Sequence, residues 1–564
     1  MKQMNIRRNF LLILLSPLFF IVQCSKSNSP SPAPTPPAPS LLYNTGAKID
    51  NTTASTSVVN YNTKVSPVIR LTFNNALNRA TVSTSVSVLE NGVTATAVNY
   101  TYENSDSTLV VTPSAPLKYL SRYNLKANTN LKSVKNGQLN TDLNIQFNTQ
   151  IDSSNKFPTI SDNALLDLVQ QQTFKYFWNF GHPVSGLARE RNTSGETVTS
   201  GGSGFGIMTI PVAINRNFIT RAQGLARMQT IVGFLKNTAI KVKGAFPHWL
   251  NGTTGAIIPF SANDNGADLV ETSYLMMGLL TARQYFNAVD VAETNLRSDI
   301  NTLYNNVEWD WFRQGGQNTL YWHYSPDKAW VMNMQIRGWN EALVTYIMAA
   351  SSTTHGIPAA VYTNGWKGGG GFANGNSYYG YQLPLGPAQG GPLFFEHYTF
   401  MGVNPNGLNE GSVNYTTQTK NHTLINYNYC KANPKVWFGY SDLVWGLTAS
   451  DINGGYTASS PTNDVSVIAP TAALSSFPYT PTESLAALKF YYYVLGDKLW
   501  KQYGFVDAFS LHNNWYADSF LAIDQGPIIV MIENYRTGLI WNLFTSCPEV
   551  KAGMLGLGFT APYL

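Results

Sequence analysis

The stretch DNGADLVETSYLMMGLLTARQYF, residues 264–286, decides the architecture of the larger part of this chain. Asp264, Asp268 and Glu271 are spaced i, i+4 and i+7, which places three carboxylates on one stripe of a helix. The rest of that stripe and the opposite face are small or apolar, so we expect a buried helix over 265–287. One carboxylate there could simply complement the helix dipole. Three of them are costly to bury unless they line a polar cavity, so the spacing predicts an active-site pocket.

The first 23 residues have the features of an export signal. A basic segment precedes FLLILLSPLFFIV, an apolar run too short to span a membrane. Cys24 follows at once, and the arrangement resembles a bacterial lipoprotein signal, in which this cysteine carries the lipid. Residues 24–43 are rich in Pro and Ser and predict a semi-extended linker. We expect an outer-membrane lipoprotein of a Gram-negative cell envelope, facing the periplasm or the exterior; the alternative is an ordinary secreted protein.

Composition narrows the classes of partner. Charged residues make up 12% of the chain and aromatic residues 13%, whereas about 25% charged residues is usual. The formal charge of +5 falls to +2 once Lys2, Arg7 and Arg8 leave with the signal. No basic run is present, so we expect no nucleic-acid partner. Low charge with many Tyr and Trp suits a protein that meets neutral ligands such as sugars, although a large core would give the same composition.

The cysteines and histidines give no support for a metal site or a cofactor. The sequence contains neither C-x-x-C nor H-E-x-x-H. Cys430 and Cys547 could pair in an oxidising compartment, but two distant cysteines define no geometry, and we expect no disulfide between them.

Residues 44–152 predict a small all-β domain. Short alternating runs are separated by turn signals such as Asn91-Gly92 and Asn136-Gly137. About seven short strands in some hundred residues favour a sandwich. The segments SPVIRLTFNNAL and LVVTPSAPL resemble the bacterial Ig-like domains that precede many surface enzymes, which implies a spacer or a packing module without chemistry. The strand runs are VIRLTF (68–73), VSVLE (86–90), STLVVTP (107–113), YNLKA (123–127) and LNIQF (143–147).

Residues 157–564 predict a large helical domain. Ser161 can cap a first helix that runs through LLDLVQQQTFKYFWNF. Long loops rich in Gly, Pro and aromatic residues alternate with the later helices, a pattern that favours a toroid of helical hairpins, an (α/α)6 barrel. The further helices are expected near 219–238, 265–287, 293–306, 336–350, 394–402, 411–429, 436–446, 482–502 and 524–545.

Eight ordered motifs carry a family resemblance over residues 160–560. They are SGLARERN (185–192), GSGFGIM (202–208), FPHWLNGTTG (246–255), the 264–286 stretch, WNEAL (339–343), WGLTASD (445–451), APTAA (469–473) and IDQGPIIVMIENYRTGLIW (523–541). This part resembles the glucoamylase-like domain of glycoside hydrolase family 144. The resemblance implies an (α/α)6 barrel that hydrolyses β-1,2-glucan internally with inversion.

Glycoside hydrolysis needs a protonated carboxyl group for the leaving oxygen and a second carboxylate for water or carbon. Glu341 lies on the predicted helix 336–350, where burial among apolar residues would raise its pKa and suit a general acid. Asp264, Asp268 and Glu271 would supply the base. Glu341 taken alone could equally be a satisfied structural residue, and the resemblance is what implies that these four are catalytic.

Sugars stack on aromatic rings and give hydrogen bonds to amides and carboxylates. Each aromatic candidate could equally pack in the core, Asp451 could be a turn residue, and Asp524 could be a helix cap. The expected substrate-binding residues are His248, Trp249, Trp322, His323, Trp339, Asn340, Asp451 and Asp524.

The sequence thus predicts a monomeric, exported hydrolase of a neutral glucan, in contact with the membrane only through its lipid anchor. A second class of function is a glycan-binding lipoprotein without catalysis, and a third option is another linkage or transglycosylation on the same scaffold. The clustered carboxylates argue against a pure binder. The low positive charge argues against a lyase for acidic polysaccharides.

Overall fold

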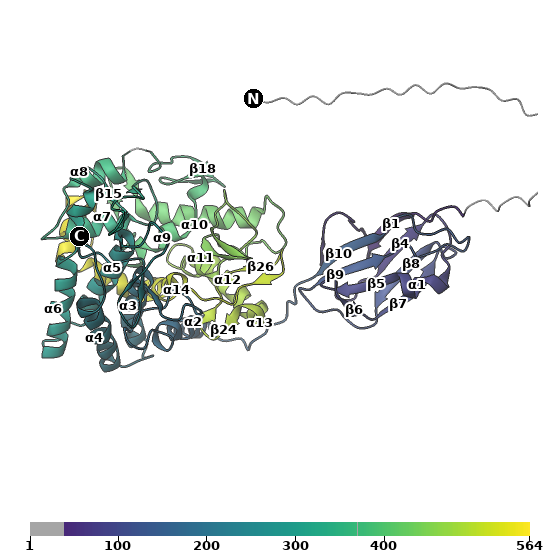
Figure 1. Cartoon of the computed structure of the whole chain (residues 1–564), viewed down its shortest axis with the longest axis horizontal. Coiled ribbons are helices and arrows are strands. Elements are labelled where there is room, and N and C mark those ends of the chain that lie inside the picture. Colours follow the sequence, from purple (N-terminus) through teal and green to yellow (C-terminus); the bar gives the residue numbers. More distant parts are fainter. Residues whose placement is uncertain (1–38, 369) are drawn as a thin grey trace, which may run out of the picture.

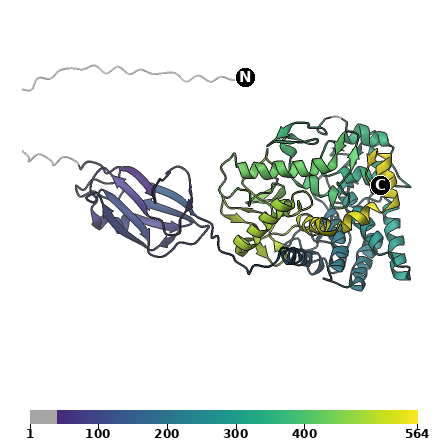
Figure 2. The same ribbon diagram turned by 180° about the vertical axis from the view of Figure 1, so that it is seen from behind.

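The computed structural model describes residues 39–368 and 370–564, so the predicted signal, most of the linker and Cys24 lie outside the described residues. Figure 1 and Figure 2 show two domains, a small β domain and a large helical one. No helix among the described residues is long and apolar enough to cross a membrane. Cys430 and Cys547 are both buried and free.

The β domain is a sandwich of two five-stranded sheets, ordered β2-β1-β4-β8-β7 and β3-β10-β9-β5-β6. Strand β4 alternates buried and half-buried residues, and a core that includes Leu71, Leu125 and Phe147 fills the space between the sheets. Asn91 and Gly92 both have positive φ, as a tight hairpin turn requires. The strands are β1 (Asn44–Ile49), β2 (Thr52–Thr53), β3 (Asn60–Thr63), β4 (Ile69–Phe73), β5 (Val86–Glu90), β6 (Thr94–Thr96), β7 (Val98–Glu103), β8 (Thr108–Pro113), β9 (Arg122–Ala127) and β10 (Leu143–Thr149).

The helical domain begins at α2, where the Ser161 side chain accepts a hydrogen bond from the Ala164 N–H as predicted. Helices that are buried almost all round (α3, α5, α7, α11) alternate along the chain with helices that expose one face (α4, α6, α10, α12). The principal helices are α2 (Asp162–Trp178), α3 (Ser200–Asn215), α4 (Arg221–Asn237), α5 (Leu269–Tyr285), α6 (Val291–Asn305), α7 (Leu343–Ser351), α9 (Phe394–His397), α10 (Tyr415–Ala432), α11 (Pro470–Leu474), α12 (Pro481–Lys489), α14 (Ala522–Thr537), α15 (Leu539–Thr545) and α16 (Pro548–Gly556).

Helix α3 packs against both α5 and α14 at the centre of this domain. The crossing with α5 is made by glycines. A Cβ atom at Gly204 would overlap the carbonyl group of Tyr274, and one at Gly278 would overlap the carbonyl group of Gly204. Sequence analysis does not predict α3, because its first turns read SGGSGFG and glycine is a poor helix former. Here the missing side chains allow two backbones to meet.

Several helix predictions are wrong in their bounds or their existence. The helix expected over 265–287 begins at Leu269, and the one expected over 336–350 begins at Leu343. Residues 436–446 form turns instead of a helix, since Val436 and Gly439 have φ values of 56° and 98°. The first two differences matter for the site, because they move Asp264 and Glu341 off their helices.

An aromatic cluster is among the contacts between the β domain and the helical domain, and Leu120 also joins the core of the helical domain. Tyr61 stacks on Phe438 and on His512, which lies between β26 (Phe509–Ser510) and β27 (Trp515–Tyr516). The Arg122 guanidinium donates to the backbone oxygen of His512 at 3.1 Å. The Ig-like module therefore packs on its neighbour at this point.

Candidate active site

Asp268 is the residue before helix α5 and caps it. Its Oδ1 accepts the N–H groups of Val270 and Glu271 at 3.0 and 2.9 Å. Its Oδ2 accepts from His248 Nδ1 at 3.0 Å and lies 3.6 Å from His323 Nε2. Burial alone would raise the pKa of Asp268, but the two imidazoles hold that pKa well below its ordinary value. Asp268 is therefore a fixed carboxylate.

Asp264 lies in the loop before β14 (Ala267–Asp268), so the helical spacing that singled it out is wrong as geometry. The pairing of β14 with β16 (His323–Tyr324), in which Asp268 lies opposite His323, nevertheless brings the acids together. Asp264 Oδ2 lies 3.3 Å from His323 Nε2, while its Oδ1 is buried without a hydrogen-bond partner. Burial and the charge of Asp268 raise the pKa of Asp264 to about 6.

Glu271, in the first turn of α5, is the member of this group that faces the cavity described below. Its Oε2 accepts the N–H of Gly201 at 2.7 Å and the Thr199 hydroxyl at 3.3 Å. Its Oε1 lies 3.9 Å from His248 Nε2. Burial raises the pKa of Glu271, and the nearby His248 partly offsets that rise.

Glu341 lies two residues before helix α7 and faces the same cavity. Its backbone oxygen accepts hydrogen bonds from the Thr399 and Tyr274 hydroxyls at 2.8 and 3.4 Å, which fix the position of the residue. Burial, reinforced by the charges of Glu271 and Asp268, raises the pKa of Glu341 to about 7. Glu341 thus carries a proton over much of the neutral range, although it does not stand on the predicted helix.

A cavity of about 440 Å³ joins Glu271 and Glu341. Its wall is mostly aromatic and aliphatic, with few charges, and it lies at the N-terminal ends of the buried helices α3, α5, α7 and α14. Phe260 stacks on His248 with ring centres 4.2 Å apart. The aromatic lining consists of Trp249, Phe260, Tyr274, Trp322, Phe394, Tyr398 and Tyr456.

A second hollow of about 500 Å³ adjoins the first and shares Arg191 and Tyr456 with it. Arg191 is fixed between Glu190 at 2.9 Å and Asp451 at 3.1 Å. Asp451, on β22 (Ala449–Ile452), belongs to the wall of this second hollow together with Trp515 and Tyr516.

The remaining sequence-predicted residues divide into two groups. His248, Trp249 and Trp322 line the first cavity, and His323 lies behind Asp264 and Asp268. Trp339 is packed in the core, where its indole N–H donates to Glu396, so the structure places it away from the cavity wall. Asn340 Oδ1 accepts the N–H of Ala342 beside the start of α7. Asp524 is buried in the first turn of α14 without capping it.

Sequence reasoning missed several residues of the cavity wall. Phe260, Tyr398 and Tyr456 come from loops or short elements without periodicity, so no pattern marks them. Glu190 and Arg191 are visible in the SGLARERN motif, but a charged pair in a loop gives no indication that it faces a ligand. Asp507, which is fully enclosed near Asp451 and Asp524, has no sequence signal at all.

His248, Asp264 and Asp268 each place a possible ligand atom within 4.8 Å of the other two. Metal binding would require a neutral imidazole. Burial lowers the pKa of His248, but the charges of Glu271, Asp268 and Asp264 outweigh this and raise it to about 9. A protonated ring that donates to Asp268 accounts for the geometry as a charge-assisted hydrogen bond.

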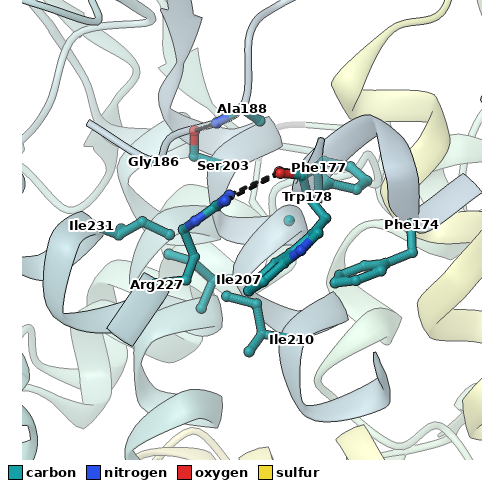
Figure 3. Close-up of a pocket in the computed structure, with 11 residues that line it drawn as sticks. Phe174, Phe177, Trp178, Gly186, Ala188, Ser203, Ile207, Ile210, Arg227 and Ile231 are labelled. Atoms are coloured by element: carbon teal, nitrogen blue, oxygen red, sulfur yellow. Dashed lines mark hydrogen bonds between the residues drawn. The ribbon is translucent and has the colours of Figure 1, made fainter. Parts of the chain in front are cut away.

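Another cavity, between α2, α3 and α4, is too small for a ligand (Figure 3). It measures about 10 Å³, and Arg227 crosses it to donate to the backbone oxygens of Phe177 and Trp178. A space of this size holds a water molecule at most. It belongs to the packing between these three helices.

Comparisons with known proteins identify the family of each domain. The family described as "Putative glucoamylase" matches residues 333–548, and the family described as "Bacterial Ig-like domain" matches residues 47–149. An exo β-1,2-glucooligosaccharide sophorohydrolase of Parabacteroides distasonis, which acts at the non-reducing end, is 44% identical over 435 residues. That match covers 73% of this chain and 60% of the relative, so this chain spans less than two thirds of that protein.

Two solved structures are matched over their whole length. A putative glucoamylase from Bacteroides uniformis is 54% identical with a TM-score of 0.72, and the match covers 72% of this chain and 100% of that one. An endo-β-1,2-glucanase from Chitinophaga pinensis, solved with sophorotriose and glucose, is 48% identical with a TM-score of 0.70 and the same two coverages. This chain therefore belongs to the glucoamylase-like family, glycoside hydrolase family 144, and carries a bacterial Ig-like domain ahead of the family domain.

Proposed function

We propose that this chain is an exported glycoside hydrolase that cleaves β-1,2-linked glucan. The observation that carries the proposal is a pair of carboxyl groups, Glu341 and Glu271, in one aromatic-lined cavity with different environments. No other described residue donates a hydrogen bond to the Glu341 carboxyl group, and burial raises its pKa to about 7, whereas Glu271 accepts hydrogen bonds from Gly201 and Thr199. The sophorohydrolase and the endo-glucanase relatives support the linkage.

In the proposed mechanism, Glu341 protonates the glycosidic oxygen as the bond breaks. The base belongs to the Asp264, Asp268 and Glu271 group, and Glu271 is its member in the cavity wall. Asp268 and His248 set the charge next to the base. The helix N–H groups donate hydrogen bonds to the Asp268 carboxylate, and His248 donates one to it as well. An attacking water between the two sides would give inversion, which requires a separation of about 6.5–9.5 Å between the carboxyl groups.

The wall composition suits a neutral sugar chain. Trp249 and Trp322 are half-buried, so each presents part of its ring to the cavity. Sugar rings stack on such surfaces, and the few charged groups position hydroxyls. The lining charges Glu190 and Arg191 are paired with each other, so the cavity presents no surplus of positive charge that would select an acidic polysaccharide.

We propose internal cleavage, because the second hollow continues the first beyond Arg191 and Tyr456. A chain that runs through both hollows can extend on either side of Glu341, as an endo-acting enzyme requires. The relatives include both an exo-acting and an endo-acting protein, so the printed names alone do not decide this point.

We propose that the helical domain is an (α/α)6 barrel. Helices α3, α5, α7, α9, α11 and α14 would form the inner ring, with α4, α6, α10 and α12 among the outer ones. Contacts of α3 with α5, α5 with α7, α11 with α14 and α14 with α3 support the ring. The hydrogen bonds from Thr399 to Glu341 and from Tyr479 to Glu396 bridge its remaining neighbours.

One experiment tests substrate and cleavage mode together. The purified protein is incubated with linear and cyclic β-1,2-glucan and with glucans of other linkages, and products are separated by chromatography. Opening of the cyclic glucan, which has no end, supports internal cleavage, whereas products from the linear chain alone support exo action. Binding without products would favour the non-catalytic glycan-binding protein. Product chains that are longer than the substrate chains would favour transglycosylation.

We further propose a lipid anchor at Cys24, motivated by the preceding apolar run and the Pro-rich segment that follows. Replacing Cys24→Ala should move the protein from the membrane fraction to the soluble envelope fraction. Unchanged fractionation would exclude the anchor. The same soluble variant should elute as a monomer in size-exclusion chromatography with light scattering.

A further inference from the structure

Asp507 and Asp524 form a buried pair beside the wall that separates the two hollows. Asp524 lies in the first turn of α14, and Asp507 lies between β25 (Gly504–Phe505) and β26. Each is only 2% exposed. Asp507 is tied into the wall by its backbone N–H, which donates to Ser519 at 3.0 Å. Ser519 in turn donates through its hydroxyl to Asp451 at 2.6 Å.

The hydrogen bonds of this pair leave one oxygen of each residue free to share a proton with the other. Asp507 Oδ2 accepts the backbone N–H of Asp451 at 2.7 Å. Asp507 Oδ1 and Asp524 Oδ2 are both buried and receive no donor from another residue, while the two side chains lie within hydrogen-bonding reach of each other. Two ionised carboxylates are acceptors only, so they cannot hydrogen-bond unless one retains its proton.

The charged groups around the pair leave it uncompensated. Asp451 on β22 adds a negative charge, and the guanidinium of Arg191 is engaged by Asp451 and Glu190. No ion pair in the described part of the chain includes Asp507 or Asp524. Tyr398 and Tyr456, which line the first cavity, are near enough for the charge of Asp524 to raise their pKa values. Burial raises the pKa of both carboxyl groups, that of Asp507 to about 7.

We propose that Asp507 and Asp524 share one proton in a carboxyl–carboxylate hydrogen bond, and that Asp507 is a positioning residue that joins helix α14 to the Asp451 strand. The joint fixes the wall between the two hollows, so this inference rests on the proposed glucan groove. Loss of the shared proton to solvent leaves two negative charges side by side in the protein interior. The wall then separates, and binding of chains that occupy both hollows weakens.

Two variants of Asp507 test the shared proton. In Asp507→Asn the amide oxygen still accepts the Asp451 N–H, and the amide N–H donates to Asp524, so the variant imitates the protonated residue. Asp507→Leu has a similar size and can do neither. We expect the wild type to bind long β-1,2-glucan with a KM that rises at alkaline pH. In Asp507→Asn the KM should stay within about threefold of the wild-type value and should not rise at alkaline pH. In Asp507→Leu it should increase about tenfold or more, because buried partners are left unsatisfied.

A readout independent of hydrolysis separates this inference from the proposed function. Infrared difference spectra between pH 5 and pH 8 record the carbonyl stretch of protonated carboxyl groups. The wild type should show one more buried carboxyl band than Asp507→Asn, and Asp524→Asn should lose the same band. If both variants keep the wild-type bands, or if Asp507→Asn behaves as Asp507→Leu does in KM, the shared proton is refuted. If no glucan is cleaved, the spectra still decide it.

Discussion

Replacing Glu341→Gln tests the central assignment. Gln preserves the volume and can still line the cavity, but it cannot give a proton to the leaving oxygen. General acid catalysis contributes about 10²- to 10⁴-fold, so turnover of β-1,2-glucan should fall by at least 10²-fold. Substrate affinity should persist, because the backbone oxygen of Glu341, which holds the loop through Thr399 and Tyr274, is unchanged.

The pH profile gives this prediction a second, independent magnitude. The pKa of Glu341 is raised to about 7. At pH 6 about nine tenths of the residue is protonated and at pH 8 about one tenth, so kcat/KM should fall about tenfold over that interval. The alkaline limb should vanish in Glu341→Gln, since no proton remains to be lost there.

A substrate with a better leaving group separates an acid role from any other. In an aryl β-1,2-glucooligosaccharide the aryl oxide leaves with little need for protonation. Glu341→Gln should therefore lose far less activity toward this substrate than toward the natural linkage. Glu308→Gln is the matched control, because Glu308 pairs with Lys243 outside the cavity wall. Full glucanase activity in Glu341→Gln, or an equal loss on both substrates, would refute the acid assignment. Retained anomeric configuration by proton NMR would contradict inversion.

Other predictions concern stability and the carboxylate group. His397 is buried, and burial lowers its pKa to about 3. Below about pH 6.5 the unfolded chain therefore binds a proton at this residue that the folded chain does not bind. Stability should fall by about 1.4 kcal/mol per pH unit as the pH drops from there, and thermal melts should show this slope diminished in His397→Gln but kept in the control His355→Gln. Gly204→Ala should destabilise the helical domain by about 3 kcal/mol or more in denaturant titrations, because the added methyl group meets backbone of α5; a wild-type midpoint would contradict the close crossing. Asp268→Asn should keep the helix cap but lower the pKa of His248 from about 9, which an NMR titration of the ring would follow; an unchanged pKa would show that Asp268 does not hold it.

The β domain could be predicted from sequence more closely than the helical one. Its strand runs differ by one or two residues at their ends from the observed strands, because alternation and Asn-Gly turns are local signals. Helix α3 could not be predicted, since its glycines lower the helical propensity of the sequence that forms it. Their advantage appears only when α5 lies against them. A tertiary contact overrides a local preference in this case.

The predicted helices contain the region of the site, but two of its four carboxylates do not lie on the observed helices. Asp264 is not on α5, and Glu341 precedes α7. The i, i+4, i+7 spacing still indicates the region, because Asp268 and Glu271 bracket the first turn of α5 and Asp264 lies in the loop just before the strand that leads into it. The pair Asp507 and Asp524 could not be found this way, since the two residues come from unconnected elements.

The position of these residues at helix beginnings explains why the cavity can hold so many acids. The free N–H groups at a helix N-terminus carry partial positive charge and donate hydrogen bonds to carboxylates. Asp268 accepts hydrogen bonds from two such groups of α5, and Glu271 accepts one from the Gly201 N–H at the start of α3. No other described residue donates a hydrogen bond to the Glu341 side chain, and burial raises its pKa to about 7, compared with about 6 for Asp264. The N-termini of α5 and α3 therefore supply hydrogen bonds to Asp268 and Glu271, whereas burial favours the protonated form of Glu341, and an acid and a base acting on one glycosidic bond require such an asymmetry.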